Sequence, residues 1–260
     1  MFRLHENSQR RICLAAFFGL CAVPTLFVLA FGVSRRLPSY ARAEEKRLSR
    51  QLGAIVTLDR VEHLRPGVVR YDGLELLDPE TGATILRCPT LRVGWKTSTH
   101  AEGQKRSSLV LIASEPEIRA EELESTWAIL KGVLTRRAGC PESNVQLTAA
   151  KAIFQHSDSS HQLTAAVATI ERLPEGSRAD IQFRLADLET PEPIQIRVER
   201  NHQIAPPATG VGLYTGGGAL PCSLAAVAVP SLDALGPNCR FRGHFWMNET
   251  SEGPAGQLVG

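Results

Sequence analysis

The chain has 260 residues, of which 43% are hydrophobic and 22% are charged; these proportions are ordinary for a folded protein and exclude an intrinsically disordered one. Its formal net charge of +2 is unevenly divided, because the first 36 residues carry +4 and the remainder carries −2. The folded part therefore lacks the basic field that nucleic acid requires, and we expect no nucleic-acid partner.

Residues 12–33 form an apolar segment of 22 residues without a charge. As a helix it would extend about 33 Å, which matches the hydrocarbon core of a bilayer. A core helix of this length normally shows a polar stripe, and this segment has none. We predict a single-pass signal anchor at 12–33, with residues 1–11 in the cytoplasm. A cleaved signal peptide is the alternative, since Ala30 and Gly32 are small, but the apolar run exceeds the usual signal length of about 7–15 residues.

A short charged segment follows the anchor. Residues 34–53 are predicted as a juxtamembrane unit with a helix over 39–52, and Gly53 is placed to cap its C-terminus. Six basic residues lie on this flank of the anchor against three on the other, so a positive-inside count places this flank in the cytoplasm. Long C-terminal domains translocate largely regardless of such charges, so the count alone does not decide the topology.

From residue 54 the apolar residues alternate with polar ones, which is typical of strands with one buried face. Strands are predicted over 54–64, with a bulge near Asp59, over 68–78 and over 83–95. The sequence Pro-Glu-Thr-Gly at 79–82 has the composition of a hairpin turn, because proline presets φ and glycine takes a positive φ.

Four carboxylates surround this hairpin: Asp72, Glu75, Asp78 and Glu80. Their spacing does not match a calcium-binding loop. On alternating strands such side chains fall on the solvated face or in turns. We therefore interpret the hairpin as architectural and expect neither a metal site nor a catalytic site in it.

The middle of the chain combines a loop, a strand and a helix. Residues 99–108 are polar and are predicted as a loop, and residues 109–120 are predicted as a strand. An amphipathic helix is predicted over 121–134, because apolar residues recur there at spacings of four, three and four, at Leu123, Trp127, Leu130 and Leu134.

From residue 144 the chain reads almost entirely as strands. The segments 145–156, 161–173, 179–189 and 193–200 are separated by turn residues. Within the last two, Ile181, Phe183 and Leu185, and then Ile194, Ile196 and Val198, alternate with polar residues. This pattern predicts antiparallel strands with one apolar face and one wet face. Gln-Leu-Thr-Ala-Ala occurs twice at a spacing of 16, which suits successive strands of a meander.

The last part of the chain is looser. The Gly-rich stretch 209–221 lacks the Lys-Ser/Thr of a phosphate loop, residues 222–236 suggest a short helix and a turn, and residues 238–260 suggest a strand, a turn and the start of another strand. A sheet that stopped there would leave an open edge. Either a partner completes the sheet or the chain is the front part of a longer protein.

Cysteine and histidine spacings give no evidence for chemistry. Four cysteines outside the apolar segment lack CxxC spacing and allow three disulfide pairings or free thiols: Cys88, Cys140, Cys222 and Cys239. No HExxH sequence and no Gly-x-Ser-x-Gly sequence occurs. We expect no enzymatic activity, no metal and no cofactor.

Residues 48–95 resemble the N-terminal module of the AsmA-like proteins of Gram-negative envelopes, the group that includes TamB. The similarity begins with the helix end at 48–53 and the strand at 56–61 and continues through Pro66-Gly67. It then includes DGLELLDPETG at 72–82 and LRVGW at 91–95. The later LGPNCRFRGHFW at 235–246 resembles the repeated strands of this family. The chain differs from long members in length, because 260 residues cannot extend a sheet across an envelope.

The resemblance implies an inner-membrane, single-pass protein whose residues 54–260 form a β-rich domain in the periplasm, with the sheet curled so that its apolar face lines a groove for acyl chains. Membrane lipids are then the expected partner. The expected fold is mainly β: a transmembrane helix followed by an antiparallel, groove-forming sheet with one or two short helices. The candidate groove residues are Ile181, Phe183, Leu185, Ile194, Ile196 and Val198.

Two alternatives remain open. The sheet could fold back on itself as a sandwich with a dry core. The protein could instead be a structural or assembly protein that pairs an exposed sheet edge with another envelope protein. In both cases the resemblance favours a cytoplasmic N-terminus, although the charge count points weakly the other way.

Overall fold

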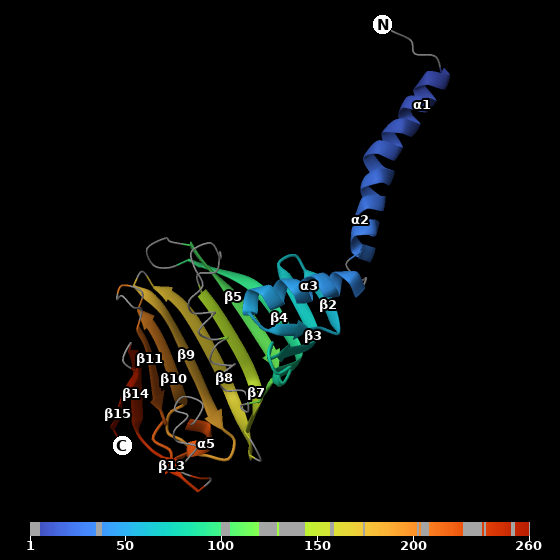
Figure 1. The fold of residues 1–260 in the computed structure, drawn as a ribbon. Helices are drawn as coiled ribbons and strands as arrows, with labels where there is room; N and C mark the ends of the chain where they lie inside the picture. Colours follow the sequence, from blue (N-terminus) through green and yellow to red (C-terminus); the bar gives the residue numbers. More distant parts are fainter. Residues whose placement is uncertain are drawn as a thin grey trace.

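The computed structural model describes most of the chain and shows a mainly β protein with an N-terminal helix (Figure 1). The described residues are 6–34, 38–99, 105–119, 129, 144–156, 159–173, 175–201, 203, 208–225, 236, 238–250 and 253–259. The predicted helix at 121–134 lies outside these residues, except for Ile129.

The apolar segment forms one continuous helical rod. It consists of α1 (Glu6–Phe17), a π-helical turn (Phe18–Ala22) and α2 (Val23–Ser34). The wide turn ends two residues before Pro24, which has no N–H to donate, and such local adjustments let membrane helices accept proline. The span Arg10–Leu29 is long and apolar enough to cross a membrane, and none of it is buried against the domain. Figure 1 shows the rod extending away from the sheet.

Helix α3 (Pro38–Leu52) follows the rod and confirms the predicted charged helix. Gly53 takes a positive φ of 71° and donates its N–H to the Ser49 carbonyl at 2.9 Å, which closes the helix. The predicted first strand is in fact two, β1 (Ile55–Thr57) and β2 (Arg60–Arg65), and both pair with β3. The strand is interrupted at Asp59, close to the predicted bulge. There the Asp59 carboxylate packs against Gly73 of β3.

Strands β3 (Val68–Leu77) and β4 (Thr84–Thr99) form the predicted hairpin. In its turn, Asp78 Oδ1 accepts the N–H groups of Glu80 and Thr81 at 2.7 and 2.9 Å, and Gly82 has the positive φ that the turn needs.

The next part of the sheet differs from the prediction. Residues 105–108, which were expected in a polar loop, belong to β5 (Lys105–Ser114), because they continue the pairing with β4. The predicted single strand 109–120 ends at Ser114 and resumes as β6 (Glu117–Arg119), with Glu115 in a left-handed conformation between them. Both β5 and β6 run parallel to β7 (Asn144–His156), so the sheet is not antiparallel throughout.

From β7 onward the sheet is an antiparallel meander, as predicted. Its strands are β8 (Ser159–Leu173), β9 (Gly176–Leu185), β10 (Ile194–Asn201), β11 (Ala208–Tyr214), β14 (His244–Thr250) and β15 (Gly253–Val259). The two Gln-Leu-Thr-Ala-Ala sequences lie on the neighbouring strands β7 and β8. Part of the Gly-rich stretch 209–221, for which no strand was predicted, lies in strand β11, whose glycines leave room for a tryptophan on β14.

Between β11 and β14 the chain forms a small cover made of β12 (Leu220–Pro221), α5 (Cys222–Ala225) and β13 (Arg240–Phe241). Within the described residues the protein has one sheet of 13 strands and this separate two-stranded pair. The described strands therefore do not form the alternative sandwich, which would need a second large sheet. In Figure 1, α3 lies at the β1–β3 end of the sheet, and α5 with β13 lies near the C-terminal strands.

Candidate functional site: the apolar face of the sheet

Directly opposed residues on neighbouring strands form an unbroken apolar row across ten strands. The strand registers place these residues in order: Val69, Val93, Leu111, Leu147, Ala168, Ile181, Ile196, Leu213, Phe245 and Leu258. Opposed residues share one face of a sheet, so this row defines a single apolar face. A second row two residues away contains Trp95, Leu109, Val145, Ile170, Ala179, Val198, Val211 and Met247.

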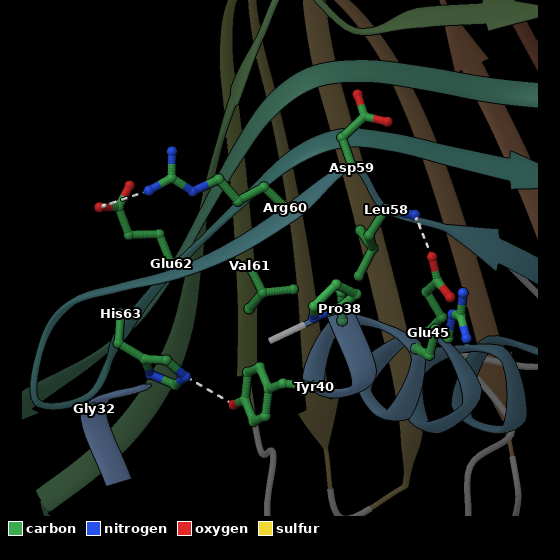
Figure 2. Close-up of a pocket in the computed structure, with 12 residues that line it drawn as sticks. Gly32, Pro38, Tyr40, Glu45, Leu58, Asp59, Arg60, Val61, Glu62 and His63 are labelled. Carbon is green, nitrogen blue, oxygen red and sulfur yellow. Dashed lines mark hydrogen bonds and ion pairs between the residues drawn. The ribbon is translucent and has the colours of Figure 1, made fainter. Parts of the chain in front are cut away.

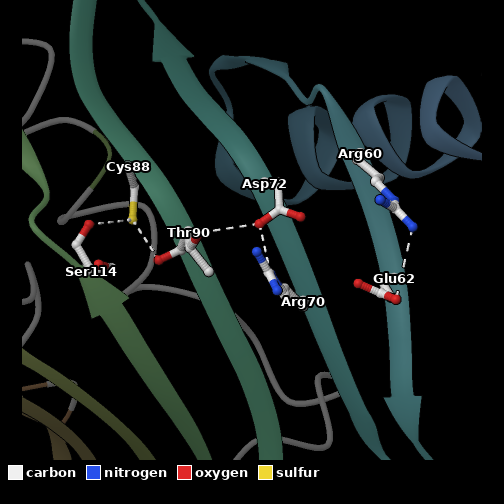
Figure 3. A network of polar contacts seen from close by, with 7 residues as sticks. All are labelled: Arg60, Glu62, Arg70, Asp72, Cys88, Thr90 and Ser114. Carbon is white, nitrogen blue, oxygen red and sulfur yellow. Dashed lines mark hydrogen bonds and ion pairs between the residues drawn. The ribbon is translucent and has the colours of Figure 1, made fainter.

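The opposite face of the sheet is polar and carries cross-strand ion pairs. Arg197 Nε lies 2.6 Å from Asp180 Oδ1, and Arg178 Nε lies 2.9 Å from Glu199 Oε1. Figure 3 shows Arg70 Nε and Thr90 Oγ1 both donating to Asp72 Oδ1, at 2.7 and 3.1 Å. The one-sided pattern predicted from the sequence is therefore present.

The carboxylates of the hairpin form an ion pair between strands and hydrogen bonds within the turn. Glu75 pairs with Arg87 at 2.7 Å, and Asp78 caps its turn.

Cys88 is a buried free thiol whose Sγ lies 3.2 Å from the Thr90 carbonyl, and burial raises the pKa of Cys88 (Figure 3). A protonated thiol is a poor nucleophile. Among the described residues no group of three or more His, Cys, Asp or Glu side chains could hold a metal ion.

Helix α3 covers the N-terminal end of the apolar face. Its residues Tyr40, Ala41, Leu48 and Leu52 pack on a buried cluster that includes Val56, Val61, Tyr71, Leu74 and Cys88. Polar contacts fix the helix in place. Glu45 Oε1 accepts the Leu58 N–H and Ser49 Oγ accepts the Val56 N–H, both at 2.9 Å. Tyr71 donates to Glu44 at 2.8 Å, and burial together with this contact raises the pKa of Tyr71.

A hollow of about 630 Å³ separates the start of α3 from β2 and also contacts Gly32 of the membrane helix. Figure 2 shows Val61 and His63 pointing from β2 toward α3, whereas Arg60 and Glu62 extend from the other side of the strand. Tyr40 Oη and His63 Nε2 lie 2.7 Å apart and join the helix to the strand. This hydrogen bond links α3 to the sheet, and the hollow therefore lies at the contact between the two.

The cover formed by β12, α5 and β13 closes the C-terminal end of the same face. Leu220, Leu224 and Phe241 are buried in one cluster with Phe183, Leu185, Ile194 and Val198. A disulfide between Cys222 and Cys239 ties the cover together, with the two Cα atoms 5.3 Å apart. Of the other cysteines considered in the sequence, Cys88 is free and Cys140 lies outside the described residues.

Between the two covers, the apolar face is only half-buried. We call this part the central band; it consists of Val93, Leu111, Leu147, Ala168, Ile181 and Ile196. Ala166 packs against the clusters at both ends, so the apolar face is continuous across the sheet. Trp95 lies beside the central band on β4 and exposes 48% of its surface.

The structure brings all six candidate groove residues onto this face and into one neighbourhood. Phe183 opposes Ile194, and Ile181 opposes Ile196. Ile181 and Ile196 belong to the half-buried central band, whereas Phe183, Leu185, Ile194 and Val198 belong to the buried cluster that also contains residues of the C-terminal cover, with Ile194 and Val198 fully buried.

Sequence reasoning did not include the half of the central band on β4, β5 and β7. The alternation at Leu91, Val93 and Trp95 was visible, but nothing local indicated that β5 pairs in parallel with β7. That pairing places Leu111 beside Leu147 and joins the two halves of the band.

A scan against models of known protein families found no match to the chain, and a search of curated proteins found no matching sequence. The fold and the face by themselves define a class of protein. This is a β protein with one N-terminal helix apolar enough to cross a membrane and one large sheet whose apolar face is covered at both ends.

Proposed function

We propose that the protein is a non-enzymatic, membrane-anchored envelope protein that binds or guides lipid along the apolar face of its sheet. The observation that carries this proposal is the central band, an apolar surface that crosses the middle strands of the sheet and is only half-buried. A contiguous apolar surface of this kind is uncommon on a protein in water unless it contacts a ligand, a partner or a membrane. Acyl chains require apolar contact without specific polar partners, and the band provides it.

The membrane helix supports the same proposal, because it would hold the sheet beside a bilayer. We place the anchor in the inner membrane and the sheet in the periplasm. The Cys222–Cys239 disulfide supports an oxidising compartment, since structural disulfides are rare in the cytosol. The resemblance of residues 48–95 to AsmA-like proteins supports a lipid ligand in an envelope.

A pair of substitutions on β10 tests the proposal. Ile196→Asp places a carboxylate on the central band, whereas Gln195→Asp places the same group one residue away on the polar face. Desolvating a charge against acyl chains is costly, and about 1.4 kcal/mol already corresponds to a ten-fold change in affinity. We expect Ile196→Asp to weaken lipid binding by roughly ten-fold or more, and Gln195→Asp to leave it nearly unchanged.

Native mass spectrometry of the full chain, released from detergent after incubation with phospholipid, measures the bound lipid. Thermal unfolding in the same detergent identifies variants that have lost their fold, and Ala168→Asp provides a second site on the band. If the wild-type chain neither retains nor accepts lipid, or if both aspartates on the band bind as well as Gln195→Asp, the proposal is refuted.

A second candidate function is assembly through the sheet edge. Among the described residues, β15 pairs only with β14, so its other edge has no strand beside it. An extended segment of another envelope protein would fit such an edge. Ile196→Asp distinguishes the two functions, because edge pairing should survive the loss of the apolar band, whereas lipid binding should not.

A further inference from the structure

The polar face of the sheet is hollowed over the strands β3, β4, β5, β7 and β8. The hollow has a volume of about 770 Å³, which lies in the range of about 300–1,000 Å³ that is usual for small-molecule sites. Arg70, Arg92 and Lys151 line it, whereas Glu115 is the only carboxylate among its described lining residues. The hollow therefore carries an excess of positive charge.

Two of these cations face each other across neighbouring strands. Arg70 on β3 and Arg92 on β4 are directly opposed in the strand register, a position in which like charges destabilise a sheet. Arg70 is compensated, because its Nε lies 2.7 Å from Asp72 Oδ1 (Figure 3). Arg92 and Lys151 form no ion pair within the described part of the chain. A bound anion would relieve the repulsion that the sheet itself leaves in place.

The hollow also has an apolar side. Ile112 on β5 is directly opposed to Arg92 and exposes 52% of its surface, at a position where the outer face of a one-sided sheet normally carries a polar side chain. Val167 on β8 continues the same row and also lines the hollow. Opposed side chains have Cβ atoms about 5 Å apart, so one small ligand can contact Ile112 and Arg92 together. Because Arg92, Ile112 and Lys151 are all exposed, such a ligand can reach them from solvent.

The backbone is irregular at two places along the hollow. Glu115 and Ala165 both line it, and they are the only described residues other than glycine with a positive φ, at 46° and 50°. Residues with a Cβ rarely adopt this conformation. The register of β8 against β9 also shifts between Thr164 and Val167. Bulges of this kind redirect side chains and are common beside functional sites, which supports a binding role for the hollow.

We propose that the hollow binds an organic anion whose phosphate or carboxylate group contacts Arg92 and whose apolar part lies on Ile112. Arginine presents a planar fork of donors that fits the oxygens of either group, and Lys151 adds to the positive field of the hollow. The site lies on the opposite face of the sheet from the central band, so it does not rest on the proposed function. A soluble organic anion and the head of an anionic lipid share this chemistry.

Isothermal titration calorimetry of the full chain in a non-ionic detergent tests the proposal. The probes are butyl phosphate, inorganic phosphate and butanol, and phosphatidylglycerol in the detergent micelles serves as a competitor. The variants Arg92→Gln and Lys151→Gln remove one charge each from the hollow. Lys96→Gln is the matched control, because Lys96 is exposed on the same face of β4, four residues from Arg92, and does not line the hollow.

We expect the wild-type chain and Lys96→Gln to bind butyl phosphate equally, and Arg92→Gln to bind it roughly ten-fold more weakly, in line with the strength of hydrogen bonds to charged groups. Lys151→Gln should show a smaller loss. Inorganic phosphate should bind more weakly than butyl phosphate, because it makes no contact with Ile112, and butanol should not bind. Competition by phosphatidylglycerol identifies a lipid head as the source of the anion, and lack of competition identifies a soluble anion.

Two substitutions of nearly equal size at Ile112 separate charge from apolar contact. Ile112→Gln should remove the advantage of butyl phosphate over inorganic phosphate and leave the binding of inorganic phosphate intact. Ile112→Glu should abolish the binding of both anions, because it places a carboxylate opposite Arg92.

Thermal unfolding distinguishes a ligand site from a structural role of Arg92. Because Arg70 opposes Arg92, Arg92→Gln should leave the melting temperature without anion unchanged or raise it. Saturating butyl phosphate should raise the melting temperature of the wild-type chain and not that of Arg92→Gln.

Four results overturn the inference. The wild-type chain could bind neither anion, or Arg92→Gln could bind butyl phosphate as tightly as Lys96→Gln. A lower melting temperature of Arg92→Gln without anion would give Arg92 a structural role. Equal binding of inorganic phosphate and butyl phosphate would refute the organic ligand. None of these results affects lipid binding on the central band, so the two proposals fail separately.

Discussion

Gly212→Ala tests how the C-terminal strands are held together, because the indole ring of Trp246 lies against two glycines of β11. A Cβ on Gly212 would lie 2.5 Å from Cε3 and 2.6 Å from Cζ3 of Trp246, and a Cβ on Gly210 would lie 2.6 Å from Cζ2. Gly212 and Trp246 are directly opposed in the register of β11 and β14. A methyl group at position 212 therefore cannot be accommodated unless the ring moves.

The expected cost follows from two opposing effects. Displacing the ring is an overpacking change, which typically costs about 1–3 kcal/mol. Replacing glycine with alanine restricts the unfolded chain and returns roughly 0.4–1 kcal/mol. The net destabilisation should be about 1–2 kcal/mol, which lowers the melting temperature by roughly 2–8 °C for a domain of this size.

Differential scanning fluorimetry of the full chain in detergent measures this shift. The matched control is Gly94→Ala on β4, where a Cβ would meet Val68 Cγ2 at 3.4 Å and the Gly67 carbonyl oxygen at 3.8 Å, both ordinary contacts. The control should be neutral or slightly stabilising. In a double-mutant cycle, Trp246→Leu should remove most of the penalty of Gly212→Ala, because the ring that clashes is gone. If Gly212→Ala melts at the temperature of Gly94→Ala, or if its penalty persists without the ring, the packing argument is wrong.

Two further predictions concern the cover and the topology. Replacing Cys222 and Cys239 with serine should destabilise the protein by about 3 kcal/mol, the value expected for closing a loop of their 17-residue separation, and an unchanged melting temperature would contradict this. A reporter that is active only after export, fused after residue 260, should give activity. A fluorescent protein that folds only in the cytoplasm, fused at the same position, should stay dark. The reverse result would place the sheet in the cytoplasm and contradict a role in the cell envelope.

The parts of the fold that could be predicted from sequence are those fixed by neighbouring residues. Alternation defined β3 and β4, and Pro79 with Gly82 defined the turn between them. The same alternation assigned Ile181 and Ile196 to one face. These features depend on strand period and turn chemistry, which act over a few residues.

The parts that could not be predicted depend on contacts between distant residues. The parallel pairing of β5 with β7 joins segments separated by about 30 residues and leaves no local pattern. The C-terminal cover also depends on a contact between residues far apart in the sequence, because Cys222 reaches Cys239 only after the chain has turned back. Strand β11 was also not predicted, because glycine is rare in strands, yet its glycines leave room for Trp246, which lies more than 30 residues later.

The apolar face of the sheet and the membrane helix can be explained together. A sheet with one apolar face is ordinarily buried by a second layer, and among the described residues α3 and the C-terminal cover supply such a layer at the two ends. Among the described residues, the central band between them remains half-buried. An apolar surface in this state gains free energy from any acyl chain that covers it, at about 25 cal/mol for each Å² removed from water. The N-terminal helix would keep this surface next to a bilayer, where acyl chains are concentrated.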